Sequence, residues 1–441
     1  MHLESQKIQL DTSPRNEYYL QLLVLMSRSR YAKGMGSAIF AMACGLAFAP
    51  AGLAQSMPLQ SAASLAPSSG GQVAPPGGIV AGPLILYPAL ELSLGHNDNL
   101  LSSDINKRGT SQMTLSPSIR AEARPGPHKI DVLFRANDVR YASSPADNYS
   151  DASLAGTADL VLSDRAGLKL RAEQKLGFDP RGSTDRAASA SPDEYVNQGA
   201  DGIFSYGAPG AKGRIEIDGG AFSRRYQNNR LTTAASDRNT TQLGGTFLWR
   251  VAPKTELLAL VQRREIDYVD PASTQDSSET RYQLGAKWEA TAKTAGIVKL
   301  GRLEKNFNSA VRTNFSGASW DGAVRWSPLT YSVLDFNTSK ATNESTGTGD
   351  FLLTQSYGVT WNHAWNSRFS SATNASWRKD EFLGTGGGRE DKTSIMGVKL
   401  TYHWQRWLRF GGEYTWTERT SSQNTFDFTR HLFMFTIGAT L

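Results

Sequence analysis

Residues 281–290 read Arg-Tyr-Gln-Leu-Gly-Ala-Lys-Trp-Glu-Ala. The even-numbered positions carry apolar or aromatic side chains, from Tyr282 to Trp288, whereas the odd-numbered positions include Arg281 and Lys287. A helix advances by 100° per residue and would mix these two sets, but a strand places alternate residues on opposite faces. The stretch therefore predicts a β-strand with one apolar face and one polar face.

The same alternation recurs from residue 83 to the end of the chain, for example over 243–250, 396–404 and 408–419. Short, turn-like links lie near 124–127, 163–166, 207–213, 250–254, 291–295, 326–330, 364–368 and 403–407. Longer polar links lie near 96–109, 142–149, 178–193, 227–238, 270–279, 306–312, 345–353, 383–390 and 420–428. Eight short and nine long links separate eighteen strands. Short turns at one end and long loops at the other predict an all-β, antiparallel, up-and-down outer-membrane barrel of about 18 strands, within a range of roughly 16–20.

Composition agrees with such a barrel. The chain has 441 residues, of which 39% are hydrophobic and 20% are charged, and its mean hydropathy is −0.40. Soluble domains usually have about 45–50% apolar residues, whereas a barrel needs an apolar side chain at only every second strand position. Downstream of residue 54 no run of about 18 apolar residues occurs, which excludes a bundle of membrane-spanning helices. The single cysteine excludes a disulfide scaffold.

Residues 1–54 are predicted to be an N-terminal extension followed by a secretory signal peptide. Basic residues precede an uncharged apolar stretch over 36–49, and small residues precede a cut after Ala54. We interpret Cys44 as part of the apolar stretch rather than as a lipidation site, so it is removed with the signal. The sequence leaves open three starting methionines, Met1, Met26 and Met35.

Residues 55–82 are rich in Ala, Pro, Ser and Gly, a composition that buries little surface. We predict a flexible periplasmic lead-in, with partner binding as the alternative. The barrel is then expected to occupy residues 83–441.

Tryptophan positions distinguish the two ends of the predicted barrel. Seven of the ten lie beside predicted short turns: Trp249, Trp288, Trp326, Trp361, Trp365, Trp404 and Trp407. Amphipathic rings favour the membrane–water interface, so five of these (Trp249, Trp288, Trp326, Trp361 and Trp404) are predicted to form a periplasmic aromatic girdle. The alternative is that they fill strands of a soluble sandwich.

The C-terminal residues predict the closing strand of the barrel. Phe433, Phe435, Ile437 and Leu441 share one parity up to the final residue. Such a strand is typical of outer-membrane barrels, whose assembly machinery recognises it, although Leu441 stands in place of the usual terminal Phe. A soluble edge strand with this face would invite aggregation, so a lipid-facing role is favoured.

Charged side chains on the polar parity are predicted to face the lumen: Arg250, Arg281, Lys287, Arg325, Lys399, Arg409, Glu413 and Arg419. Two interpretations remain open. Mixed charges hydrate a wide lumen and form cross-strand pairs, or a basic majority attracts an anionic solute such as an acidic polysaccharide. After residue 54 the chain keeps 42 basic and 38 acidic residues, a net charge of +4 that is spread along the sequence. This distribution is not a nucleic-acid footprint.

No residue pattern indicates catalysis. The six histidines are scattered, and neither a Gly-x-Ser-x-Gly elbow nor a phosphate-binding loop occurs. His363 and His403 lie beside short turns and are interpreted as polar interface residues. Asp98 is the only acid in residues 95–100, so a turn is favoured over a calcium site. We therefore predict neither enzymatic activity, nor a cofactor, nor a metal site.

Residues 90–101, Leu-Glu-Leu-Ser-Leu-Gly-His-Asn-Asp-Asn-Leu-Leu, resemble the first strand of EpsL/VpsM-like outer-membrane β-barrel porins, which are associated with bacterial exopolysaccharide biosynthesis operons. His96 stands at the family's aromatic position. The resemblance implies an outer-membrane, non-enzymatic conduit or accessory for exopolysaccharide secretion, with the polymer and periplasmic polysaccharide-export components as partners. The alternatives are a general diffusion porin or small-solute uptake channel and, less favoured, a barrel-embedded hydrolase.

Overall fold

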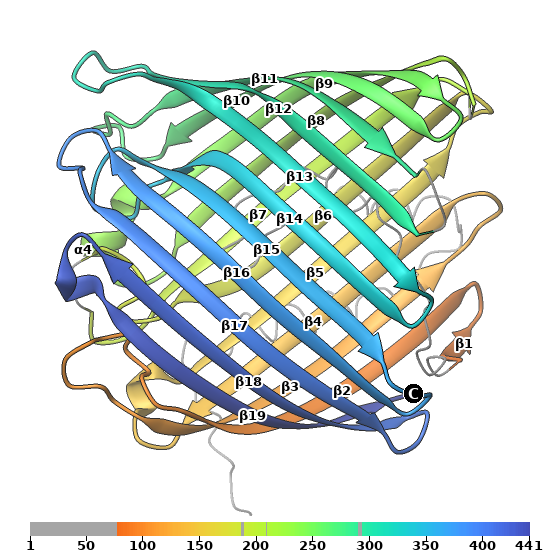
Figure 1. Ribbon diagram of the computed structural model, residues 1–441. Coiled ribbons are helices and arrows are strands. Elements are labelled where there is room, and N and C mark those ends of the chain that lie inside the picture. Colours follow the sequence, from red (N-terminus) through yellow and green to blue (C-terminus); the bar gives the residue numbers. More distant parts are fainter. Residues whose placement is uncertain (1–76, 187–188, 209, 290–292) are drawn as a thin grey trace, which may run out of the picture. The chain divides into compact units, whose positions relative to one another are not determined.

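Eighteen long strands, β2 to β19, pair edge to edge in chain order, and β19 pairs back onto β2 (Figure 1). Every pairing is antiparallel, and β10 joins β9 as well as β11, so the sheet closes into a barrel. The computed structural model describes residues 77–441 except 187–188, 209 and 290–292. The predicted fold, an antiparallel barrel of eighteen strands, is confirmed.

The strands are β1 (Ile79–Ala81), β2 (Leu84–Asn97), β3 (Thr110–Ala123), β4 (Lys129–Tyr141), β5 (Tyr149–Val161), β6 (Ala166–Asp179), β7 (Asp193–Tyr206), β8 (Gly213–Tyr226), β9 (Arg238–Ala252), β10 (Thr255–Tyr268), β11 (Ser277–Trp288), β12 (Thr294–Phe307), β13 (Phe315–Leu329), β14 (Ser332–Glu344), β15 (Phe351–Ala364), β16 (Phe369–Leu383), β17 (Glu390–His403), β18 (Leu408–Ser421) and β19 (Phe428–Thr440). Short helices interrupt three long loops: η2 (Pro145–Asp147), α4 (Arg230–Thr233) with η3 (Ala234–Ser236), and η4 (Asn424–Phe426).

The barrel has two chemically different faces, as the alternation predicts. On β11, Tyr282 and Leu284 are 47% and 70% exposed, whereas Gln283 between them is 4% exposed. A single-layered wall can bury a side chain only on its inner side, so the apolar parity points outward and the polar parity inward. The low hydrophobic content thus follows from a wall whose outer half alone is apolar.

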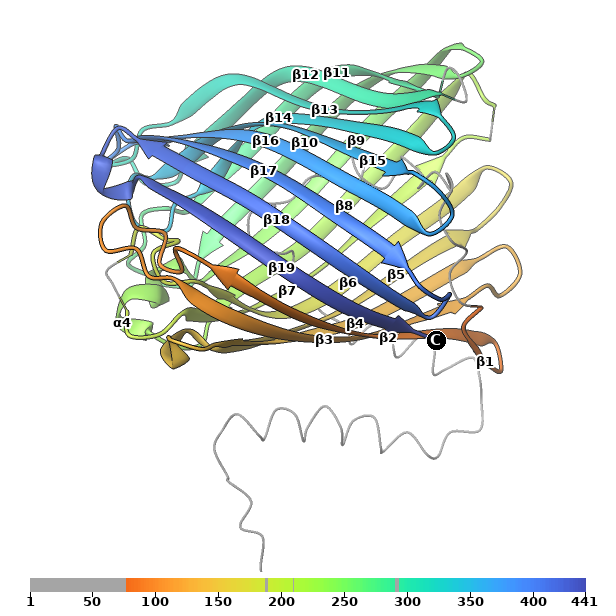
Figure 2. The same ribbon diagram turned by 60° about the horizontal axis from the view of Figure 1, so that its bottom comes forward.

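The two ends of the barrel differ in the length of their connections. Short turns join the strands at the end that holds β1 and the C-terminus, and the long loops with α4 lie at the opposite end (Figures 1 and 2). Each turn and loop lies within a few residues of the place predicted from sequence. In the described residues no helix is long and apolar enough to cross a membrane.

The barrel closes where β19 pairs with β2, a junction that we call the seam. One strand beside it was not predicted from the sequence. β19 pairs with β2 from Leu432↔Asn97 to Thr440↔Ala89, which leaves the start of β2 without that partner. The three-residue strand β1 pairs with this remaining edge, from Ile79↔Leu86 to Ala81↔Leu84. β1 lies within the range 55–82 that we assigned to the lead-in, so the end of that segment belongs to the sheet.

Candidate functional site

The β6–β7 connection crosses the long-loop end of the barrel, which we call the mouth. Arg181 bonds Asp147 in the β4–β5 loop, and the Cα of Gly182 lies so close to Leu101 that an added Cβ would meet the Leu101 carbonyl oxygen. Asp185 pairs with Arg389, which directly precedes β17. β7 and β16 stand nine places apart in a ring of eighteen strands, so the Asp185–Arg389 pair links the segment Pro180–Arg186 to a loop of the opposite wall. Arg186, next to Asp185, stays bonded to Asp193 and Tyr226 on the segment's own side of the barrel.

Arg389 anchors this crossing segment. Its side chain is 2% exposed and lies between two rings, with its guanidinium carbon 4.1 Å from the Phe382 centroid and 3.7 Å from that of Phe426. Two nitrogens donate to the Asp391 carboxylate at 2.8 and 2.6 Å, and Nη1 lies 2.7 Å from Asp185 Oδ1. Burial lowers the pKa of Arg389, but the hydrogen bond to Asp391 and the charge of Asp185 outweigh it and raise the pKa.

A second anchor holds the start of the crossing segment. Arg181 donates two hydrogen bonds to Asp147, at 2.7 and 2.5 Å, and Ser144 donates another at 2.5 Å. Burial raises the pKa of Asp147, but the hydrogen bonds from Arg181 and Ser144 outweigh it and hold that pKa below its ordinary value. Asp147 is therefore ionised, and the anchor intact, at neutral pH.

The tip of the β14–β15 hairpin bends into the mouth. β13 begins at Phe315, but its pairing with β14 extends only as far as Trp320↔Lys340. Phe351 at the start of β15 packs on Phe307 and Phe315, with centroid distances of 6.1 and 5.4 Å. Phe307 is an inner-face residue of β12 and is 8% exposed, so the hairpin tip covers the inner side of β12–β13.

This bend brings five buried polar side chains together in what we call the mouth cluster: Tyr268, Glu279, Arg281, Lys305 and Glu344. Lys305 Nζ donates to Glu344 at 2.7 Å, and Tyr268 donates to the same carboxylate at 2.8 Å. Arg281 donates to Glu279 at 2.8 and 3.0 Å. Each buried charge therefore has an oppositely charged partner, as burial in a protein interior requires.

The other predicted lumen charges are spread around the wall, mostly in pairs with neighbouring strands. Arg250 lies 3.6 Å from Glu256, Arg325 lies 2.7 Å from Asp335, and Lys399 lies 3.5 Å from Glu413. Arg409 pairs with Glu91 across the seam, Arg419 donates to the Phe426 carbonyl at 2.6 Å, and Lys287 stands opposite Glu256 in register. The structure brings only Arg281 into the mouth cluster, and a role of these charges in solute passage stays a prediction.

The five predicted girdle tryptophans lie near the short-turn end. Trp404, Trp249 and Trp326 are 58%, 44% and 43% exposed. Trp361 donates to Ser332 Oγ at 2.9 Å, and the Trp288 ring covers Gly296 on the adjacent strand. Their contact with the membrane interface stays a prediction. His363 sits against this belt, with its ring centroid 4.3 Å from Trp365.

Residues 90–101, which resemble the family's first strand, contribute hydrogen bonds that join β2 to β19 at the seam. The Asn99 side chain is fully buried and donates to the carbonyls of Ser103 and Thr429, at 2.7 and 2.9 Å. Asp98 accepts a hydrogen bond from the His431 backbone N–H at 2.7 Å. Because Thr429 and His431 belong to β19, the turn after β2 fastens the first long strand to the last. The four predicted closing-strand residues, Phe433, Phe435, Ile437 and Leu441, are 55%, 49%, 39% and 63% exposed.

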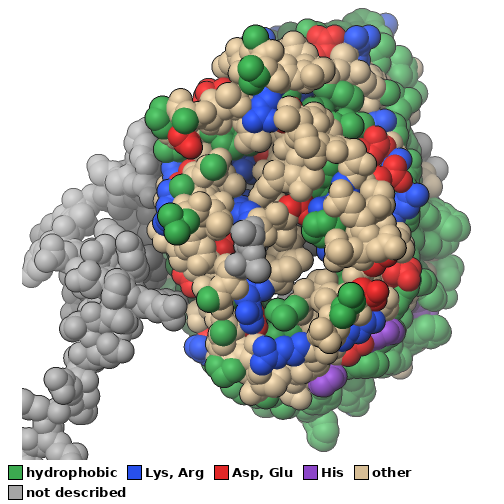
Figure 3. Space-filling model, turned by 90° about the vertical axis from the view of Figure 1, so that its left-hand side faces the viewer, with side chains coloured by type: hydrophobic (Ala, Val, Ile, Leu, Met, Phe, Trp, Pro, Cys, Tyr) green, Lys and Arg blue, Asp and Glu red, His purple; other side chains and the backbone are tan. Residues whose placement is uncertain are grey.

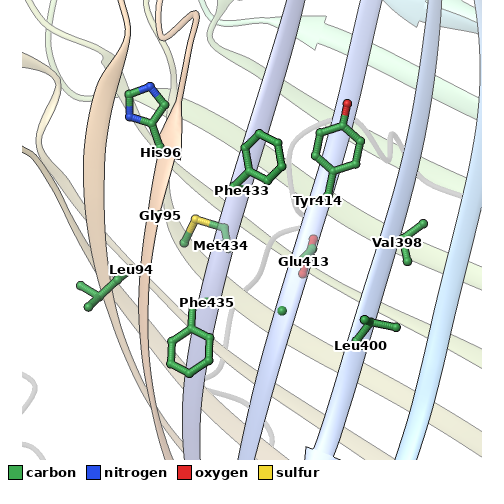
Figure 4. Close-up of a pocket in the computed structure, with 11 residues that line it drawn as sticks. Leu94, Gly95, His96, Val398, Leu400, Glu413, Tyr414, Phe433, Met434 and Phe435 are labelled. Carbon is green, nitrogen blue, oxygen red and sulfur yellow. The ribbon is translucent and has the colours of Figure 1, made fainter.

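A shallow groove of about 530 Å³ crosses the outer face at the same seam (Figure 4). Leu94, Phe435 and Leu400 line it, and Gly412 supplies no side chain to its floor. The groove faces outward with the apolar parity, so it lies on the lipid side and apart from the mouth. Among the described residues no group of three or more His, Cys, Asp or Glu could hold a metal ion.

Comparison with known proteins agrees with the β-barrel fold. Residues 74–440 match the family described as "Putative beta-barrel porin 2". The chain belongs to this porin family. The predicted outer-membrane β-barrel is thereby confirmed, while nothing in the match concerns an EpsL/VpsM relationship or exopolysaccharide. No curated protein matches this porin-family chain.

Several solved porins are similar to this porin-family barrel in fold. Pseudomonas aeruginosa OpdK with vanillate is 13% identical with a TM-score of 0.46, covering 81% of this chain and 99% of OpdK. Acinetobacter baumannii OccAB3 is 10% identical with a TM-score of 0.45, covering 82% and 100% of the two chains. A BenF-like porin from Pseudomonas fluorescens Pf-5 is 9% identical with a TM-score of 0.45, covering 82% and 99%.

Proposed function

We propose that this porin is a passive, non-enzymatic channel through which small polar solutes cross the outer membrane. The carrying observation is the mouth, which the segment Pro180–Arg186 crosses from one wall to the other through Asp185 and Arg389. An eighteen-stranded barrel without such a crossing would enclose a wide aqueous lumen. The crossing divides that opening, which suits small molecules better than a polymer chain.

The wall chemistry supports a solute path. Inner-face charges are held in pairs, such as Arg325 with Asp335 and Lys399 with Glu413. Seen along the barrel, the mouth is hollowed near its centre, with acidic and basic side chains of both signs around it (Figure 3). Paired charges hydrate a lumen but leave little net field, so we expect permeability to K⁺ and Cl⁻ to be similar rather than strongly anion-selective.

These observations do not support exopolysaccharide secretion. A polymer would have to thread past the Asp185–Arg389 and Lys305–Glu344 pairs, each of which is almost fully buried. The alternative from the sequence, a small-solute channel, is therefore the one we propose. Recognition of the closing strand by the barrel assembly machinery and contact with periplasmic export components stay predictions.

Reconstitution tests the proposal directly. The folded protein in liposomes should allow swelling in a mono- or disaccharide solution and should give discrete conductance steps in a planar bilayer. Swelling should stop as the sugar is lengthened to an oligosaccharide, because the crossed mouth excludes larger solutes. Folded protein that gives neither conductance nor swelling would refute the channel, and equal entry of a long polysaccharide would refute the size limit.

A further inference from the structure

The short turns of the barrel share a positive charge that the long loops lack. Seven of the eight turns between strands carry one basic residue each, which we call the turn cations: Arg124, Arg165, Lys212, Lys254, Lys293, Arg368 and Arg406. The same eight turns contain two acidic residues, Asp164 and Glu289. The nine long loops contain seven basic and nine acidic residues, so the two ends of the barrel differ in the sign of their charge.

The turn cations are open to the surroundings of the barrel. All seven are exposed. Arg124 pairs with Glu122 at the end of β3, whereas five of the others form no ion pair within the described part of the chain: Arg165, Lys212, Lys254, Arg368 and Arg406. Inner-face charges such as Lys399 have carboxylate partners. An exposed cation without a counter-charge attracts anions from outside the protein.

The arrangement of the turn cations indicates the kind of partner. Because the strands pair in chain order, successive turns follow one another around the rim, and the cations are spread over the whole short-turn end (Figures 1 and 2). A docked protein would contact one side of such a rim. The membrane leaflet surrounds it on every side, and in outer-membrane barrels the short turns face the periplasm.

Neighbouring tryptophans place these cations at the depth of the lipid headgroups. Trp404 and Trp407 flank Arg406 in one turn and are 58% and 51% exposed. Lys212 Nζ lies 5.9 Å from the ring centroid of Trp249, which is 44% exposed. Indole rings settle at the boundary between hydrocarbon and headgroups, so a cation beside such a ring lies where lipid phosphates are.

We propose that the turn cations bind the phosphate groups of anionic glycerophospholipids, so that the barrel collects these lipids around its short-turn end. A basic residue close to an anionic membrane surface favours binding roughly fivefold. The cations stand on separate turns, so each meets a different headgroup, and the result is an enriched ring of lipid rather than one tight site. This interaction does not depend on which solute passes the channel.

The chain's own tryptophans report on the lipids beside the short turns, because seven of the ten lie there. The full chain is reconstituted in phosphatidylcholine vesicles that contain increasing amounts of brominated phosphatidylglycerol or, separately, brominated phosphatidylcholine. Bromine quenches tryptophan emission on contact. We expect brominated phosphatidylglycerol to bind roughly two- to fivefold more strongly. This preference should vanish in 1 M NaCl, where screening acts within about 3 Å. Equal quenching by the two lipids at low salt would overturn the proposal.

Substitutions assign the preference to the turns. The turn variant replaces the five cations without ion pairs: Arg165→Gln, Lys212→Gln, Lys254→Gln, Arg368→Gln and Arg406→Gln. The matched control removes five exposed cations near the mouth, four of which have carboxylate partners: Lys107→Gln, Arg140→Gln, Arg263→Gln, Arg302→Gln and Lys392→Gln. We expect the turn variant to lose the preference and the control to keep it. An unchanged preference in the turn variant, or an equal loss in both, would overturn the proposal. The salt series needs no substitution, so it decides the question if the turn variant does not fold.

A periplasmic polymer with carboxylates is the other partner that these cations could attract. Purified insoluble peptidoglycan tests it by sedimentation with the detergent-solubilised full chain, at the salt concentration used for quenching. We expect the barrel to stay in the supernatant. Co-sedimentation that the five turn substitutions abolish, together with equal quenching by the two lipids, would assign the turn cations to the polymer and overturn the lipid proposal.

Discussion

Releasing the crossing segment should change the conductance of the mouth, and Asp185→Asn is the sharpest way to release it. Asp185 Oδ1 lies 2.7 Å from Arg389 Nη1, and the two side chains are 9% and 2% exposed. Asparagine keeps the size of the side chain but removes its charge. Arg389 keeps its bonds to Asp391, so the substitution weakens the crossing without leaving the guanidinium unpaired.

The magnitude follows from the burial of this pair. The Asp185–Arg389 contact is an ion pair between nearly buried groups. Close charge pairs have coupling energies from about 1.5 kcal/mol upward, so we take about 1.5–3 kcal/mol for this pair; each 1.4 kcal/mol is a factor of ten in an equilibrium. Asp185→Asn should therefore raise the population of the detached segment roughly 10- to 150-fold. Arg389→Ala should have a larger effect, because it also leaves Asp391 buried without its partner, at a cost of about 3–5 kcal/mol.

Planar-bilayer recording measures this population as the fraction of time spent at a higher conductance level. Asp104→Asn is the matched control, since it removes the same charge from an exposed position in the β2–β3 loop at the same mouth. We expect the higher level to become frequent in Asp185→Asn and to stay rare in Asp104→Asn. Identical conductance histograms for the two variants would show that the Asp185–Arg389 contact does not limit the mouth.

Three further predictions concern the seam, the mouth cluster and pH. Asn99→Ala removes the side-chain hydrogen bonds to Ser103 and Thr429 and should lower the free energy of unfolding by about 1–3 kcal/mol. Urea unfolding measures this loss as a lower midpoint at which the folded barrel's band on an unheated gel disappears. An unchanged midpoint would contradict a role of Asn99 in the seam. Glu344→Gln leaves fully buried Lys305 without its counter-charge and should cost about 3–5 kcal/mol, most of which Lys305→Met in the same chain should restore in the same assay. The Asp147 anchor should persist at pH 5 and be lost only below the ordinary carboxyl pKa of about 3.9, because its own pKa is lowered. Conductance at pH 5 should therefore match that at pH 7, whereas Asp147→Asn should change it at both pH values; a transition of the unsubstituted protein above pH 5 would contradict this reasoning.

The barrel could be predicted because its determinant is local. Alternation in residues 281–290 assigns each side chain to a face without knowledge of any partner strand, and the turns that separate such stretches give the strand order. The outer and inner parities of β11 accordingly agree with the exposures of Leu284 and Gln283. Alternation cannot predict a strand as short as β1, because three residues are too few to show a two-residue period.

The mouth could not be predicted because it depends on contacts between opposite walls. Asp185 and Arg389 lie in loops whose sequences do not reveal each other, and only closure of the ring brings them together. The sequence does not mark the bent hairpin either. Thr342 and Glu344 share the parity of outward-facing Phe336. Polar residues such as Arg263 and Glu265 also lie on the outer parity of β10, which stays paired within the wall on both sides.

The chemistry of the mouth also explains why its charges are paired rather than absent. Buried ion pairs contribute little net stability, and apolar residues of similar volume often replace them without loss. In the proposed channel, such a replacement would place apolar surface against the solute path, whereas the Lys305–Glu344 hydrogen bond holds the hairpin and the Arg389–Asp185 ion pair holds the crossing segment. Removing one partner is far more costly than removing both. These two charged pairs therefore fix the positions of the hairpin and the crossing segment while keeping polar groups at the mouth. We expect single substitutions that remove one charge of either pair to change the width of the mouth.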